Sequence, residues 1–219
     1  MDSIRYNYNH YLQDMKEELG KQWPDNRTLN IVCHGHSVPS GYFATPVVDS
    51  FNAYPHLLHK QVKAHYPYAV LNVIVTGIGG ETSLSGRTRI TGDVLGHRPD
   101  VVTIDYGLND RGIGLSAAQE SWKEMIELLL DREIKVILLT PTWDRSYGTG
   151  DESWLSLQQH TEQIRHLAQE YKVGLCDSFA AYQSYVDAGG ILEDLLSYVN
   201  HPNARGHALV AGELAKFLL

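Results

Sequence analysis

The feature that most constrains the fold of this chain is a regular alternation of short β-branched runs with longer amphipathic stretches. The β-branched runs cover residues 29–33, 70–75, 101–106, 136–140 and 173–176. They are apolar almost throughout, which is typical of strands buried on both faces of a parallel sheet. The amphipathic stretches carry apolar residues at helical spacing over residues 53–65, 117–132, 153–171 and 203–218. Such strict alternation predicts an α/β domain with right-handed crossovers between its strands.

Length and composition agree with a single globular domain over residues 1–219. The chain has 219 residues, of which 43% are hydrophobic and 20% charged. It can therefore bury a sizeable core without disulfides or metal. No linker-like composition divides it, and residues 1–26 are predicted to form an extra helix ahead of the sheet.

Charge and hydropathy argue against several classes of partner. A net charge of −8 disfavours a nucleic-acid surface. No apolar run approaches the roughly 18 residues of a membrane span, and residues 1–20 lack the apolar core of a secretory signal. Cys33 and Cys176 both lie in apolar runs, where reduced core thiols are expected. The sequence therefore predicts a cytoplasmic protein without nucleic-acid or membrane partners.

Polar motifs follow the predicted strands, at the edge where open parallel sheets bind ligands. The first motif is Gly35-His36-Ser37. A serine at a glycine-assisted turn just past a strand can be exposed as a nucleophile. A turn or helix cap is the commoner role for such a serine, so this motif alone leaves both interpretations open.

The next two motifs offer hydrogen-bond donors. Gly77, Gly79 and Gly80 let the backbone present N–H groups to an anionic oxygen, unless they only form a flexible turn. Asn109 follows the third strand and carries an amide that can donate toward developing negative charge. Its alternative role is to begin an Asx turn.

A histidine near the C-terminus supplies a candidate base. His201 precedes Pro202 and Asn203 on a predicted loop. A loop histidine can act as a general base near neutral pH, whereas Asn203 is expected to cap the final helix.

Ser37, Gly77, Asn109 and His201, in this chain order, resemble the SGNH hydrolase superfamily, the GDSL-type esterases and lipases. The resemblance spans about residues 29–218. Further matches to the family's sequence blocks are Gly35, Gly80, Thr82, Gly107, Asp110, Pro202, Asn203, Gly206 and His207.

The resemblance implies a fold, a reaction and a set of residue roles. The family fold is a three-layer α/β/α sandwich around a five-stranded parallel sheet of flavodoxin-like type. The family reaction is acyl transfer without metal or organic cofactor, in which Ser37 would attack an ester carbonyl after His201 removes its proton. The backbone N–H groups of Ser37 and Gly77 and the side chain of Asn109 would form the oxyanion hole.

The sequence departs from the family pattern at two positions. His36 replaces the aspartate of the first block, and Tyr198 stands where the last block has the aspartate that orients the histidine. Tyrosine cannot supply that carboxylate. We expect Asp194 to replace it, because its place shortly before the histidine makes delivery easiest. Glu193 and Asp177 are the other candidates, and a serine–histidine pair with a neutral acceptor is the alternative.

The expected substrate is a small-molecule ester with a short acyl group such as acetyl, with carbohydrate esters as a candidate class. Tyr42, Phe43, Trp143, Tyr147 and Trp154 are predicted to form an aromatic substrate lip. The alternative for these rings is plain packing.

Two functions of other classes stay open. His34 and His36 have the spacing of a metal pair, as in a metal-dependent hydrolase. The chain could instead be a ligand-binding protein on the same fold that lost catalysis together with the aspartate at position 198.

Overall fold

The sheet is the central element of the structure, a computed structural model that describes residues 8–198 and 200–219. Parallel strands form one five-stranded sheet in the order β2-β1-β3-β4-β5. The strands are β1 (Thr28–Gly35), β2 (Val70–Val75), β3 (Val101–Asp105), β4 (Lys135–Leu139) and β5 (Gly174–Cys176). The α/β class and the five-stranded parallel sheet are therefore confirmed.

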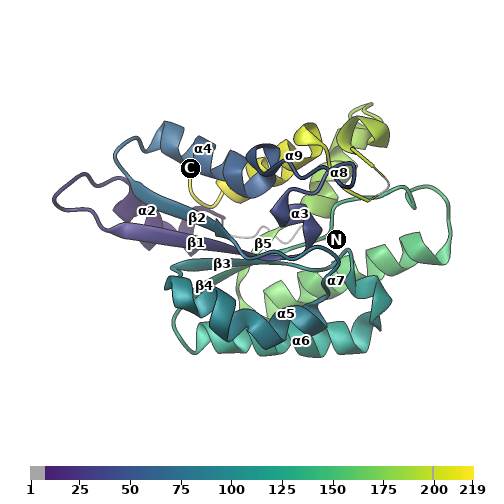
Figure 1. Cartoon of the computed structure of the whole chain (residues 1–219), viewed down its shortest axis with the longest axis horizontal. Coiled ribbons are helices and arrows are strands. Elements are labelled where there is room, and N and C mark those ends of the chain that lie inside the picture. Colours follow the sequence, from purple (N-terminus) through teal and green to yellow (C-terminus); the bar gives the residue numbers. More distant parts are fainter. Residues whose placement is uncertain (1–7, 199) are drawn as a thin grey trace.

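Helices cover both faces of the sheet and complete a three-layer arrangement (Figure 1). One face carries α2 (Gln13–Leu19), α4 (Tyr54–His65), α8 (Ser178–Asp187) and α9 (Ala204–Ala215). The other carries α5 (Ser83–Arg89), α6 (Gly114–Leu130) and α7 (Glu152–Tyr171). Shorter helical segments are α1 (Tyr8–Tyr11), α3 (Ser37–Ser40), Ser50–Asn52, Ile90–Val94, Leu95–His97, Asp110–Gly112 and Leu192–Leu195.

The core forms because alternate strand residues face opposite helical layers. Val136 and Leu138 pack with residues of α6 and α7, whereas Ile137 and Leu139 pack with residues of α2, α4 and α9. Successive side chains of a strand point to opposite faces. A run that is apolar throughout can therefore fill both layers, which is why these runs predicted buried strands.

β2 departs from that expectation because it lies at the edge of the sheet. It pairs only with β1. Val70 is 46% exposed and Val75 is 42% exposed. The apolar run of β2 thus predicted a strand correctly but did not predict its exposure, which depends on strand order.

Two helices were not predicted from periodicity. α5 contains Ser83, Ser85 and Arg87 and has few apolar positions to mark a buried stripe. α8 begins directly after β5, where Asp177 caps it by accepting a hydrogen bond from the Ala180 N–H. The predicted N-terminal helix corresponds to α1 and α2, and residues 1–7 of that prediction lie outside the described residues.

The strand order has its switch point between the carboxyl ends of β1 and β3. β2 lies on one side of β1 and β3 on the other, so the chain leaves these strands in opposite directions, and ligands bind at such a switch point. Gly35 at the end of β1 lies beside Asp105 at the end of β3. A Cβ at Gly35 would lie 2.5 Å from the Asp105 carbonyl oxygen, so only glycine allows this approach.

The two cysteines are free thiols in the interior. Cys33 and Cys176 are both buried, and burial raises the pKa of Cys33 to about 12. Among residues 8–198 and 200–219, no helix combines the length and apolarity that crossing a bilayer requires.

Three buried histidines link folding stability to pH. Burial lowers the pKa of His34 and His160 to about 4 and that of His207 to about 3, because an imidazolium loses its hydration in the interior. In the unfolded chain these rings titrate near 6.5. The unfolded state therefore binds more protons between pH 6.5 and about 3, and the free energy of unfolding falls as the pH is lowered through that range.

We expect His160→Leu to reduce this acid sensitivity, because the variant lacks one of the three titrations. The free energy of unfolding lost between pH 7.5 and pH 4.5 should be smaller than in the wild type by roughly 1–3 kcal/mol. Urea titrations followed by circular dichroism at the two pH values measure the difference. An equal loss in the two proteins would show that His160 is not the source.

Candidate active site

The site begins with the turn that follows β1. His36 caps the short helix α3 by accepting a hydrogen bond from the Val38 N–H at Nδ1, 3.3 Å away. Ser37 is therefore the first residue of α3, and its hydroxyl lies at the carboxyl edge of the sheet. The Ser37 Oγ is 3.0 Å from Nε2 of His201. The structure thus brings together two residues that lie 164 positions apart in the sequence.

His201 is held by the loop that leads into α9. The Ser197 N–H donates to the His201 carbonyl over 2.9 Å, and a bridge joins Leu196 to Pro202. Asn203 caps α9, as predicted, because its side-chain oxygen accepts hydrogen bonds from the backbone N–H groups of Arg205 and Gly206. These contacts fix the backbone on both sides of the ring.

The other ring nitrogen of His201 contacts a backbone carbonyl. Nδ1 is 2.9 Å from the carbonyl oxygen of Phe43, and since a carbonyl only accepts, Nδ1 carries the proton. Nε2 is then the lone-pair atom that faces Ser37. Burial lowers the pKa of His201, the Phe43 carbonyl partly opposes that shift, and the nearby His36 adds to it.

The expectation that Asp194 supports His201 is therefore wrong. The Asp194 carboxylate accepts from the Tyr185 hydroxyl at 3.0 Å and lies 3.5 Å from the Arg205 guanidinium. The short helical turn that carries Asp194 packs against α9, so its side chain is directed toward α8 and α9 instead. Proximity in sequence did not reveal this direction.

The two other acidic candidates are also placed elsewhere. Asp177 caps α8 and pairs with Arg165 over 2.9 Å. Glu193 is exposed on the same turn as Asp194. Tyr198, at the position of the family's aspartate, is 54% exposed. In the described part of the chain the hydrogen-bond acceptor of His201 Nδ1 is thus a neutral carbonyl.

Candidate oxyanion donors lie at the Ser37 turn and after the strands on either side of β1. The backbone N–H groups of Ser37 and Gly77 donate no hydrogen bond within the described residues. A Cβ at Gly77 would lie 2.6 Å from the His36 carbonyl oxygen, so glycine is needed for this close pass beside the Ser37 turn. Asn109 donates one amide hydrogen to the Glu81 carbonyl over 2.8 Å, which leaves its second amide hydrogen to donate.

Asp110 links the segment after β2 to the segment after β3, a contact that the motif alone did not reveal. Its buried carboxylate accepts from the Ser83 N–H and from the Trp122 indole, each at 2.7 Å. Burial raises its pKa, although both hydrogen bonds oppose the shift. Ser83 begins α5, directly after the loop that contains Gly77. The hydrogen bond from Ser83 to Asp110 therefore joins the end of that loop to the neighbour of Asn109 in the chain.

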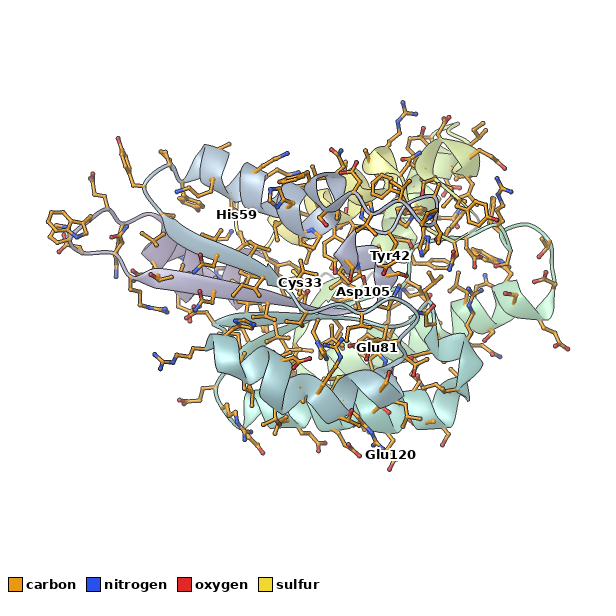
Figure 2. All side chains as sticks on the ribbon, viewed as in Figure 1. Cys33, Tyr42, His59, Glu81, Asp105 and Glu120 are labelled. Atoms are coloured by element: carbon orange, nitrogen blue, oxygen red, sulfur yellow. The ribbon has the colours of Figure 1, made fainter. Side chains whose placement is uncertain are left out.

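A second histidine contacts the same serine. His36 Nδ1 is 3.2 Å from the Ser37 Oγ, and His36 Nε2 is 3.5 Å from Asp105 Oδ1. Both side chains are buried. Figure 2 shows Asp105 toward the carboxyl end of the strands, with Tyr42 and Glu81 on either side of it in this view. The sequence had marked His36 as a departure from a family pattern and as half of a possible metal pair, but not as a contact of Ser37.

A family model matches most of the chain. The model of the GDSL-like lipase/acylhydrolase family covers residues 33–209, a range that includes Ser37, Gly77, Asn109 and His201. The chain belongs to this family. It is a carboxylic ester hydrolase of the GDSL type, and its substrates are small-molecule esters.

Several solved structures share the fold of this esterase. A catalytic variant of an acetylxylan esterase from Geobacillus stearothermophilus has a TM-score of 0.76 at 22% identity, over 87% of this chain and 94% of that chain. A two-domain esterase active on acetylated mannans has a TM-score of 0.73 at 24% identity, over 95% of this chain and 52% of that chain. An alpha/beta hydrolase enzyme from the metagenome of Lake Arreo, Spain, has a TM-score of 0.70 at 21% identity, over 87% and 94%. No curated protein sequence matched the chain.

The aromatic residues predicted to form a substrate lip lie in different surroundings in this esterase. Tyr42 is half-buried beside Gly79, and its ring centroid is 6.1 Å from that of His201. Trp143 is fully buried and stacks on Tyr147 with ring centroids 4.3 Å apart. The expectation that Trp143 contacts substrate is therefore wrong, because its ring packs into the core instead of lining the surface.

The proposed metal pair is also not supported by the geometry. His34 Nδ1 is 2.9 Å from the Thr76 hydroxyl, and His34 Nε2 is 3.1 Å from the Gly86 carbonyl oxygen. Both ring nitrogens therefore have protein partners, and none of the described residues form a group of three metal-ligating side chains. His34 instead ties β1 to α5.

We expect Asp194→Asn to leave kcat/KM within about twofold of the wild type, because the carboxylate contacts Tyr185 and Arg205 and surface changes of this kind have small effects. As a comparison, Asp177→Asn should lower Tm by a few degrees, since Asp177 caps α8 and pairs with Arg165. Hydrolysis of p-nitrophenyl acetate and thermal melting measure the two effects. A severe loss of kcat in Asp194→Asn would show that its carboxylate does reach His201.

Proposed function

We propose that this esterase hydrolyses short-chain acyl esters, with acetyl esters preferred, and that Ser37 is the nucleophile and His201 the general base. The observation that carries the proposal is the 3.0 Å contact between the Ser37 hydroxyl and the lone-pair nitrogen of His201. A serine within hydrogen-bond reach of an oriented base is the arrangement that activates a hydroxyl for attack.

The mechanism is acyl transfer in two halves. The Ser37 oxygen attacks the ester carbonyl carbon while its proton passes to His201 Nε2. The resulting oxyanion accepts hydrogen bonds from the N–H groups of Ser37 and Gly77 and from the Asn109 amide, and each such donor contributes about 3 kcal/mol by comparison with removal of single donors. The proton on His201 then passes to the leaving alcohol. Water attacks the acyl-enzyme with His201 again as base, which releases the acid and restores Ser37.

The neutral partner of His201 affects its strength as a base. The Phe43 carbonyl holds the tautomer in which Nε2 accepts, which is one of the two tasks of a triad carboxylate. It carries no charge, so it stabilises the imidazolium formed during attack less than a carboxylate does. Burial further disfavours the charged ring.

The acyl and alcohol parts of the substrate are inferred from two sources. Solved structures of the same fold include an acetylxylan esterase and an esterase active on acetylated mannans. Tyr42 offers this site a half-buried aromatic ring near His201, and aromatic faces suit sugar rings. The Ser37–His201 contact favours catalysis over mere binding of such esters.

We expect Ser37→Ala to lower kcat for p-nitrophenyl acetate by at least about 10³-fold with an unchanged Tm. The wild-type kcat/KM should fall from the acetate to the butyrate to the octanoate ester, and acetylated xylo-oligosaccharides should release acetate. Activity in EDTA serves as the control for the metal-dependent alternative. Wild-type activity in Ser37→Ala would overturn the serine mechanism, and faster hydrolysis of octanoate would overturn the acetyl preference.

The pH profile should report the base. His201 accepts a proton only when its ring is neutral, and burial lowers its pKa from the usual 6.5. The kcat/KM for p-nitrophenyl acetate should therefore be full above pH 6.5 and decrease on the acid side, with its midpoint below 6.5. Steady-state rates between pH 4.5 and 8.5, with Tm measured at each pH, test this. A midpoint above 7 would contradict the assignment.

A further inference from the structure

Two imidazole rings, not one, lie within hydrogen-bond reach of the nucleophile. His201 Nε2 is 3.0 Å from the Ser37 Oγ, and His36 Nδ1 is 3.2 Å from the same atom. Both histidines are buried. The mechanism above uses only His201, so the second contact is unexplained.

The hydrogen bonds of His36 show which of its nitrogens carries the proton. The Val38 N–H points at Nδ1 over 3.3 Å, and since an N–H only donates, Nδ1 presents a lone pair. In the neutral ring the proton is then on Nε2, which lies 3.5 Å from Asp105 Oδ1. The Ser37 hydroxyl therefore has a choice of two acceptors, one on each ring, for its single proton.

Asp105 places a carboxylate beside His36, whereas the acceptor beside His201 is a neutral carbonyl. It is 4% exposed, and burial of a carboxylate is costly unless a partner compensates it. Within the described residues its ion-pair partner is His36. His36 Nε2 has no hydrogen-bond partner there, so the ring is directed at Asp105 by an electrostatic contact slightly longer than a hydrogen bond. A proton gained by His36 would complete a buried ion pair.

A capping role alone does not account for this arrangement. The cap needs one acceptor for the Val38 N–H, and Asn or Asp would supply it. Nothing about the cap requires a buried carboxylate behind the ring. The 3.3 Å capping bond is also long, so protonation of Nδ1 forfeits little.

We propose that His36, backed by Asp105, is a second general base for Ser37 and replaces the imidazole–carboxylate pair that the chain lacks around His201. The proposal rests on the serine mechanism above. As the Ser37 oxygen bonds to the acyl carbon, its O–H bond breaks and an N–H bond forms at His36 Nδ1, while the carbonyl electron pair moves onto the oxyanion. When the ester C–O bond breaks, that proton passes to the leaving oxygen and His36 is neutral again. Asp105 acts through His36 and is a positioning residue.

The test compares His36→Asn, His201→Ala and the double variant with Ser37→Ala. Asn keeps an acceptor for the Val38 N–H but is not a base. The substrate is p-nitrophenyl acetate, whose leaving group needs no proton, so the rate of p-nitrophenol release reports the base step. We expect His36→Asn to lower kcat by about 10-fold or more with KM little changed. We also expect His201→Ala to stay at least about 10-fold more active than Ser37→Ala. The variant that carries both His36→Asn and His201→Ala should be no more active than Ser37→Ala.

A second variant keeps the test decisive if His36→Asn does not fold. Asp105→Asn preserves the shape of the carboxylate and removes its charge, and it should lower kcat about 10-fold with little change in KM. His160→Leu is the matched control, because it removes a buried imidazole of α7 that has no role in the proposal, and its kcat should equal that of the wild type.

Each other outcome overturns a defined claim. Wild-type kcat in the folded His36→Asn and Asp105→Asn variants, or equal activity in His201→Ala and Ser37→Ala, would show that His36 is only a helix cap. Wild-type activity in Ser37→Ala would instead remove the serine mechanism itself. The failure of this inference is thereby distinguished from the failure of the proposed function.

Discussion

The close approach of β1 to β3 at their carboxyl ends is the constraint on which the site depends. Gly35 pairs with Asp105, and the His36 N–H donates to the Asp105 carbonyl over 3.3 Å. This contact holds the turn from which α3 begins, so it sets where Ser37 presents its hydroxyl. The loop after β2 then passes beside the His36 carbonyl at Gly77. A larger residue at Gly35 would separate the two strands and displace the turn that carries the nucleophile.

The loop between α3 and the next helix supplies the hydrogen-bond acceptor for His201 Nδ1, where the family pattern has an acidic side chain. The Tyr42 N–H donates to the Ser37 carbonyl over 3.1 Å, and the Phe43 N–H donates to the Val47 carbonyl over 3.0 Å. The Phe43 ring also stacks on His207 with centroids 5.2 Å apart. These contacts make the Phe43 carbonyl a rigid acceptor for His201. It orients the ring but brings no negative charge, whereas His36, the other histidine that contacts Ser37, lies 3.5 Å from Asp105.

The carboxylate of this site therefore lies beside a different histidine from the one in the family pattern. The family pattern places a carboxylate behind the histidine of the last block, where this chain has Tyr198. The structure places a buried carboxylate at the end of β3 instead, behind the histidine that replaces the first block's aspartate. The two departures concern what supports a histidine beside the nucleophile, since His36 and His201 both contact the Ser37 Oγ.

The sequence by itself determined the α/β architecture, because apolar runs and helical stripes record local geometry that each segment needs for burial. Its resemblance to the GDSL-type esterases also implied that Ser37 and His201 would meet. Only the tertiary structure decided what contacts the two imidazoles. Asp194 is near His201 in sequence but directed at α8 and α9, and Trp143 lies in a loop but packs in the core. The direction of a loop side chain depends on which distant elements pack around it, and a periodic pattern carries no record of that packing.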